Sequence, residues 1–247
     1  MISKFKQFII VESATVDVSH WNAQKGSQMG SNEGGIHTDE SGQKHYVKIA
    51  KDPEQARQEV ASSQIHELMG VNTLKPMLIK KGKRVGTATK WNGDLETKSP
   101  KHFETLDHDQ AAQITRIHHA AVITKNWDSV GLVHDNVMFH NKTGAAHAVD
   151  QGGSFNFRAQ GGHKDYGADI GEIKSLRDKD MNRSAAHVFA HTFKNHPNIE
   201  KNELTSVHKL NYNDVHEIFK KNGVKDPKAM ADTLMKRKEL LLKHYGN

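Results

Sequence analysis

Oxygen-bearing side chains in the middle of the chain have the spacing of a divalent-cation site. Asn136 precedes a short apolar segment, a polar turn follows, and a second apolar segment ends in Asp150 before two glycines. This pattern predicts a β-hairpin that brings Asn136 and Asp150 close together. Amide and carboxylate oxygens are ligands that Mg²⁺ accepts, with phosphate oxygens among the remaining ligands. We therefore expect Asn136 and Asp150 to be metal ligands.

Two further carboxylates, Asp128 and Asp135, lie just before this hairpin. Either of them could act as a general base or orient a substrate, and the sequence leaves the choice between them open. The alternative for the whole segment is ordinary turn chemistry, because Asp and Asn are common in loops.

A glycine-rich segment near the start of the chain is too rich in glycine for a helix. Glycine lets backbone amides approach a phosphate closely, and neighbouring Ser and Asn side chains can add donors. The segment is not a P-loop, since no Gly-Lys-Ser/Thr follows it, and a mobile surface loop is the alternative. The candidate nucleotide-binding residues are Gly30, Ser31, Asn32, Gly34 and Gly35.

Lys48 and Glu59 form the next candidate pair. Lys48 lies in an apolar strand just after the glycine-rich segment, and Glu59 lies in the helix that follows. A lysine in such a strand costs desolvation unless it is paired. A Lys–Glu pair of this kind aligns the lysine with the α- and β-phosphates of a nucleotide. An edge-strand lysine in water is the alternative.

The order of these signals carries more weight than any one of them. Glycine loop, strand lysine, helix glutamate, Asp with Asn, and a final Asp before glycine follow one another as in a kinase site. The sequence therefore predicts a site for ATP and Mg²⁺.

Other kinds of site find less support. The chain has 18 histidines, but no His-Glu-x-x-His spacing that would indicate a zinc enzyme. It has no cysteine, which excludes disulfides and thiolate metal sites, and no Gly-x-Ser-x-Gly nucleophile motif.

The bulk composition agrees with a folded, well-solvated protein. The chain has 247 residues, 35% hydrophobic residues and a net charge of +6, with acidic residues interspersed and no long basic run. A phosphate-bearing ligand suits this charge, whereas nucleic-acid binding is not expected, since no aromatic stacking platform accompanies the basic helix at residues 236–243. We expect packing to explain that helix. No signal or membrane-spanning segment is apparent, so we expect a soluble protein of the cytoplasm, either of the producing cell or of a host.

Hydrophobic patterns and capping signals divide the chain into two parts. We expect strands at 8–11, 14–18, 45–49, 77–79 and 85–88, with one helix from Pro53 to about residue 69 behind an Asp52 cap. The polar segment 91–108 should be loop-rich, and 158–180 should also be a loop. Further helices are expected at 107–123, 183–194, 202–208, 212–222 and 226–244. This indicates an α+β fold with a β-rich lobe at 1–95 and a mainly helical lobe at 96–247.

The combined motifs resemble a group of bacterial and phage proteins with a kinase-like, nucleotide-binding fold. The similarity runs over residues 20–195 and includes Asp39, Gly42, Tyr46 and the segments 126–136, 149–154, 157–159 and 175–178. More remotely, the chain is similar to atypical kinases, namely phosphatidylinositol kinases, persistence-toxin kinases and small effector kinases. The resemblance implies a two-lobed protein-kinase-like fold and an ATP- and Mg²⁺-dependent phosphotransferase, with a protein hydroxyl as the expected acceptor.

The resemblance also implies roles for individual residues. Lys48 would contact the nucleotide phosphates and Glu59 would hold it, while Asp150 and Asn136 would bind Mg²⁺. Asp128 would be the base, although it lies farther before Asn136 than the base of protein kinases lies before its metal-binding Asn. Related folds can instead transfer AMP, and a nucleotide-binding scaffold without catalysis is a further alternative.

Overall fold

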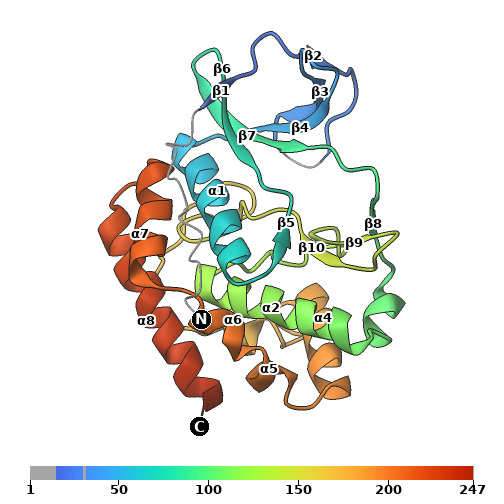
Figure 1. The fold of residues 1–247 in the computed structure, drawn as a ribbon, viewed down its shortest axis with the longest axis vertical. Helices are drawn as coiled ribbons and strands as arrows, with labels where there is room; N and C mark the ends of the chain where they lie inside the picture. The colour runs from blue at the N-terminus through green and yellow to red at the C-terminus, as the bar shows by residue number, and fades with distance from the viewer. Residues whose placement is uncertain (1–14, 30–31, 247) are drawn as a thin grey trace, which may run out of the picture.

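The computed structural model describes residues 15–29 and 32–246, and its elements are shown in Figure 1. The chain forms β-strands first and helices later, as predicted. In chain order the elements are β1 (Val16–Asp17), β2 (Asn22–Ala23), β3 (Gly34–Thr38), β4 (Lys44–Ile49), α1 (Pro53–Leu68), β5 (Asn72–Thr73), β6 (Met77–Lys81), β7 (Arg84–Lys90), β8 (Leu95–Thr97), the short 3₁₀ helix η1 (Pro100–Glu104), α2 (His108–Thr124), β9 (Val137–His140), β10 (Ala146–Ala148), α3 (Glu172–Ser175), α4 (Arg183–Asn195), α5 (Ile199–Asn202), α6 (Leu204–His208), α7 (Tyr212–Lys221) and α8 (Pro227–Gly246).

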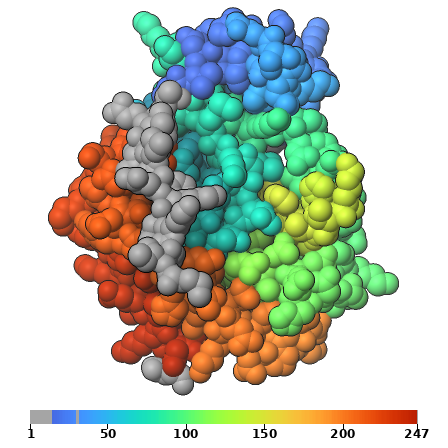
Figure 2. Space-filling view, in the orientation of Figure 1, coloured from blue at the N-terminus to red at the C-terminus, as the bar shows by residue number. Residues whose placement is uncertain are grey.

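A six-stranded sheet with the order β1-β6-β7-β4-β3-β2 forms the upper part of the molecule, above the helices (Figure 1, Figure 2). All its pairs are antiparallel except β1 with β6. Glycines flank β4 on both sides: a Cβ at Gly34 would lie 2.0 Å from the Val47 carbonyl oxygen, and one at Gly86 would lie 2.1 Å from that of Lys48. Only glycine permits such close approach, so both neighbouring strands are held tightly against the strand that carries Lys48.

Helix α1 packs below this sheet and begins where its capping signal predicts. The Asp52 side chain accepts a hydrogen bond from the Glu54 N–H at 2.8 Å, and Pro53 occupies the first helical position. Several polar side chains of the helix are buried, among them Gln55, Gln58 and Glu59. A polar face that is buried must meet polar partners, and here it meets the segment after β10.

A second sheet, in the order β5-β10-β9-β8, lies between the first sheet and α2 in the view of Figure 1. The predicted hairpin is confirmed as β9 and β10, and α2 is confirmed with a capping box formed by Asp107 and Gln110. The segment 91–108 is loop-rich as predicted, and within it lie β8 and η1, which the sequence did not indicate. β8 gains its conformation by pairing with β9, a long-range contact that local composition does not encode. The lobe boundary that we predicted between residues 95 and 96 falls inside β8. The division of the chain into lobes at that point stays a prediction.

The remaining helices match their predicted positions closely. The helix expected at 202–208 is α6, Leu204–His208, and a further short helix that was not predicted, α5, precedes it. The expected loop 158–180 contains the short helix α3. The strand expected at 8–11 lies outside the described residues, and the strand expected at 14–18 is reduced to Val16–Asp17 in β1.

Arg237 of α8 is fully buried and joins four segments of the helical part. Its guanidinium donates to the carbonyl oxygens of Val122 and Ile123 at 3.2 and 3.0 Å and to that of Gly167 at 2.7 Å, and it pairs with the buried Glu172 carboxylate. The planar fork of arginine suits several carbonyl oxygens at once. The basic helix near the end of the chain is therefore a packed element, as expected.

Within 15–29 and 32–246, every helix is too short or too polar to cross a membrane.

Replacing Arg237 with Met should lower the free energy of unfolding by about 3–5 kcal/mol, because Glu172 then stays buried without its partner. Denaturant titration measures the effect. Lys236→Met, an exposed position one residue earlier in α8, is the matched control and should change the stability by less than about 0.5 kcal/mol. The double variant Arg237→Met with Glu172→Gln should recover part of the loss, and a single Arg237→Met variant as stable as the control would contradict this account.

Candidate active site

Lys48 is the centre of the candidate site and contacts two carboxylates. Its Nζ lies 2.8 Å from Glu59 Oε1 of α1 and 3.0 Å from Asp150 Oδ1, which follows β10. Two consecutive elements, β4 and α1, thus meet the distant end of β10 at one ammonium group. The structure brings together Lys48, Glu59 and Asp150, all of which the sequence selected.

The charges of this group are strongly coupled. Burial alone would lower the pKa of Lys48, but the adjacent Asp150 and Glu59 carboxylates hold that pKa above its usual range. Burial raises the pKa of Glu59, with Lys48 opposing the rise and Asp150 adding to it. Burial also acts to raise the pKa of Asp150, but Lys48 and the Gly152 N–H bring it below its ordinary value. Asp150 is therefore an anion, as a metal ligand must be.

The two glycines after Asp150 fit tightly against the site. The Gly152 N–H donates to Asp150 Oδ1 at 2.8 Å, and a Cβ at Gly152 would lie 3.3 Å from both Lys48 Nζ and Glu59 Oε2. Gln55 of α1 donates to the Gly152 carbonyl oxygen at 3.0 Å. The glycine therefore lets the chain turn directly beneath the ammonium group while α1 holds it in place.

Asp128 and Asn136 form the second half of the site. Asn136 Nδ2 donates to the Asp128 carbonyl oxygen at 2.6 Å and lies 3.2 Å from Asp128 Oδ2. With Nδ2 committed in this way, Oδ1 is the atom that Asn136 can offer to a cation. Burial raises the pKa of Asp128 to about 6, and the negative charges of Asp150 and Asp135 add to the rise against the hydrogen bond from Asn136.

Asp135, the rival of Asp128, occupies a different setting. It is exposed, and its Oδ1 lies only 2.1 Å from where a Cβ of Gly131 would be. Gly131 has a φ of +78°, which glycine adopts freely. The Asp135 carboxylate thus packs against Gly131 in the turn before β9. Asp128, in contrast, is half-buried and hydrogen-bonded to Asn136.

Two further residues, Asn126 and Lys164, contact the candidate site, and neither of them was selected from the sequence as a site residue. Asn126 Oδ1 accepts from the Asp128 N–H at 3.0 Å and so fixes the start of the loop. Lys164 Nζ donates to the carbonyl oxygens of Lys125 and Gly153, the latter at 2.6 Å. Burial and the positive charge of Lys125 lower the pKa of Lys164 to about 7, against the opposing effect of Glu172. Lys164 lies in a segment without a motif, so only its tertiary position identifies it.

The predicted nucleotide-binding glycines are partly in a strand. Gly34 and Gly35 begin β3, where Gly34 pairs with Lys48 and Gly35 with Val47. Met29, after β2, is anchored to β4, because its N–H donates to the Tyr46 hydroxyl at 3.0 Å. Asn32 Oδ1 is buried and has no hydrogen-bond partner among the described residues. Gly30 and Ser31 lie outside the described residues.

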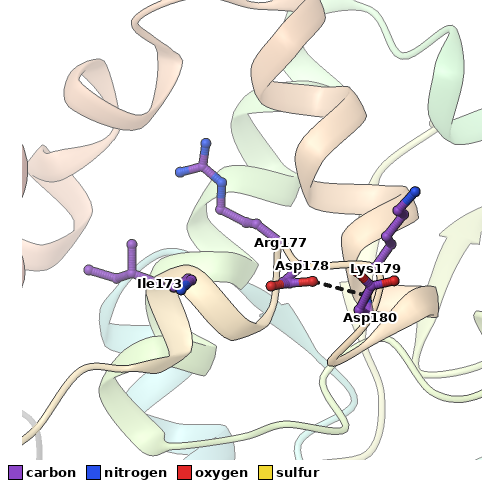
Figure 3. A pocket seen from close by; sticks show the side chains of 6 residues that line it. Ile173, Arg177, Asp178, Lys179 and Asp180 are labelled. Atoms are coloured by element: carbon purple, nitrogen blue, oxygen red, sulfur yellow. Dashed lines mark hydrogen bonds between the residues drawn. The ribbon is translucent and has the colours of Figure 1, made fainter.

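A separate hollow of about 460 Å³ lies at α3 and the segment that follows, as Figure 3 shows. Its charged side chains are of both signs, and Asp178 accepts from the Asp180 N–H at 2.9 Å while Arg177 pairs with Glu200. The Asp178 carboxylate and the Arg177 guanidinium of this hollow are therefore engaged in bonds of the chain itself. The convergent charges around Lys48 remain the better candidate for an active site.

Comparison with known proteins supports the fold. No family model matches the chain, and no curated protein matches its sequence. The crystal structure of CtkA, a proinflammatory kinase of Helicobacter pylori, superposes with a TM-score of 0.59 at 10% identity over 93% of this chain and 94% of that chain. An aminoglycoside phosphotransferase from Alicyclobacillus acidocaldarius matches at 11% identity and a TM-score of 0.39 over 91% of this chain and 92% of that chain.

The similarity to the Helicobacter kinase covers almost the full length of both chains. The predicted protein-kinase-like architecture, with a β-rich first part and a mainly helical second part, is therefore confirmed.

Asp128→Asn should stabilise the metal-free protein by about 1–2 kcal/mol at pH 7.5, since the raised pKa means that the charged carboxylate is disfavoured in the folded state. A raised carboxyl pKa adds stability that is complete below pH 3.8 and is lost as the pH rises through about 6. The advantage of the variant should therefore be largest above pH 6 and shrink toward pH 4.

Denaturant titrations in EDTA from pH 4.5 to pH 7.5 measure this difference. The control is Asp165→Asn, an exposed carboxylate whose removal should change little at either pH. An Asp128→Asn variant no more stable than wild type at pH 7.5 would refute the assigned environment.

Proposed function

We propose that this chain is an ATP- and Mg²⁺-dependent phosphotransferase that acts on protein hydroxyl groups. The single observation that carries the proposal is the Lys48 ammonium held between Glu59 and Asp150, at 2.8 and 3.0 Å, within a kinase-like fold. Perturbed carboxylates at one place are a mark of catalytic sites.

Lys48 and Glu59 would position the nucleotide. Glu59 holds the ammonium from the side of α1, while Asp150 is its second partner in the structure. Phosphate oxygens would replace Asp150 beside Lys48 when the nucleotide binds, and Asp150 would then be free to serve as a ligand. Asn32, Gly34 and Gly35, at the start of β3, would lie over the phosphates.

Asp150 and Asn136 fit Mg²⁺, because the first is an anion with a partly exposed side chain and the second has an amide oxygen to offer. Mg²⁺ would supply positive charge that neutralises the phosphate oxygens during transfer. Both residues belong to the β9–β10 hairpin region, which α2 and the second sheet support. We propose these two residues as its ligands.

Asp128 would act as the base toward the acceptor. The hydroxyl oxygen of the acceptor attacks the γ-phosphorus, the bond from that phosphorus to the bridging oxygen breaks, ADP leaves, and the hydroxyl proton passes to Asp128. A carboxylate with a pKa of about 6 is ionised at neutral pH yet basic enough to accept a proton. Asp128 is preferred over Asp135 because it is half-buried and held by Asn136 and Asn126.

Asp150→Ala should lower γ-phosphoryl transfer at least a hundredfold, since the proposed carboxylate ligand of Mg²⁺ is lost. The assay uses ATP labelled on the γ-phosphate with Mg²⁺, and the chain itself and a mixture of Ser-, Thr- and Tyr-containing peptides are offered as acceptors. Asp165→Ala, an exposed carboxylate on a neighbouring loop, should transfer label at the wild-type rate.

A parallel assay with α-labelled ATP separates the alternatives. Transfer of γ-label alone supports the phosphotransferase, whereas covalent incorporation of α-label would show adenylyl transfer on the same scaffold. Tight ATP binding by calorimetry without any transfer would instead support a scaffold without catalysis. Undiminished γ-transfer by a folded Asp150→Ala protein would overturn the site assignment.

A further inference from the structure

A second cluster of metal-ligating side chains lies away from the Lys48 group, between η1 and α4. It consists of Glu104 at the end of η1 with His187 and His191 of α4. One ligand atom from each residue lies within 4.8 Å of the other two, and His187 Nε2 lies 3.8 Å from Glu104 Oε1. Ligand atoms around one metal ion are roughly 3–4 Å apart, so only small side-chain shifts separate this cluster from a coordination shell.

Rigid elements hold these three side chains in place. His187 and His191 are one helical turn apart and therefore lie on the same face of α4. The η1 segment is fastened to that face, because Asn195 Nδ2 donates to the Glu104 carbonyl oxygen at 3.0 Å and His187 Nε2 contacts the Pro100 carbonyl oxygen at 3.0 Å. Sites built on such elements keep their geometry before the ligand arrives.

The hydrogen bond of His191 prepares its ring for coordination. Nδ1 lies 2.7 Å from the His187 carbonyl oxygen, which can only accept, so Nδ1 carries the proton. Nε2 of His191 then has its lone pair available. Metal-binding histidines commonly use one ring nitrogen for a backbone carbonyl in this way, which fixes the tautomer and the ring orientation.

We infer that Glu104, His187 and His191 form a binding site for Zn²⁺. Two imidazole nitrogens and one carboxylate oxygen are a ligand set that Zn²⁺ takes in tetrahedral geometry, with a fourth position left for water or another ligand. Mg²⁺ and Ca²⁺ prefer oxygen ligands throughout, which distinguishes this site from Asn136 and Asp150. In the metal-free chain, His187 Nε2 donates to the Pro100 carbonyl oxygen, which can only accept. On binding, this hydrogen bond would be lost, the ring proton would pass to Nδ1 through solvent, and Nε2 would bind the metal.

The position of the site links it to the loop that carries Asp128. His187 and His191 line a hollow of about 660 Å³ together with Leu132 and His134 of that loop. The His134 and His187 rings are 5.6 Å apart, and Ser184 of α4 donates to the Leu132 carbonyl oxygen at 2.8 Å. A metal ion on His187 would therefore fix α4 at the point where the helix supports this loop.

Cobalt spectroscopy on the EDTA-treated full chain tests the site. Co²⁺ should give the intense visible absorption of a tetrahedral complex at one equivalent per chain, and Zn²⁺ should displace it. Glu104→Gln and His191→Ala should each weaken Co²⁺ and Zn²⁺ binding at least a hundredfold, because the first removes the negative charge of a ligand and the second removes a ligand altogether. Glu104 is exposed, so its variant keeps the fold, and circular dichroism checks both proteins.

The matched control is His216→Ala, another half-buried histidine beside a carboxylate, Glu217, that is outside the cluster. It should bind Co²⁺ and Zn²⁺ as wild type does. Equal metal affinity in wild type, Glu104→Gln and His191→Ala would overturn the site, as would wild-type protein without tetrahedral cobalt absorption at one equivalent. The readout needs no catalysis, so its outcome is independent of the proposed function.

Discussion

The cost of removing the Lys48 charge from water is the constraint on which the arrangement of the site depends. Lys48 lies on β4, in the middle of the first sheet. Glycines in the two adjacent strands have no side chain and so let those strands approach β4 closely. An ammonium group there needs carboxylates, and one comes from α1 and the other from the end of β10. The sheet, the helix and the hairpin must therefore dock together, and the pairing of one charge aligns the two parts of the chain.

Local signals made much of the fold predictable. Asp52 before Pro53, Asp107 with Gln110, and Asp226 before Pro227 mark helix starts through bonds between near neighbours, and the structure has all three helices. β8 and η1 were not foreseen, because β8 depends on pairing with β9 and η1 on packing against α4. Contacts between distant segments leave no periodic mark in the sequence.

The same distinction explains which parts of the site could be foreseen. Lys48, Glu59 and Asp150 follow one another along the chain in the same order as the strand, helix and hairpin of a kinase-like fold. Their order in the sequence was therefore enough to select them. Asp128 and Asp135 are alike in sequence, and only burial and the bond to Asn136 separate them. Lys164 and the cluster at Glu104 come from segments without motifs, since side chains meet there through packing alone.

Arg237 has a consequence for the order of events during synthesis. A nascent chain that has emerged as far as residue 230 contains Lys48, Glu59, Asp128 and Asp150, yet it lacks the arginine that ties α2, the segment around Gly167 and Glu172 together. Until α8 leaves the ribosome, Glu172 lacks the arginine with which it forms its direct ion pair. The contacts that join α2, the segment around Gly167 and Glu172 are thus completed only after every residue of the candidate site has been synthesised.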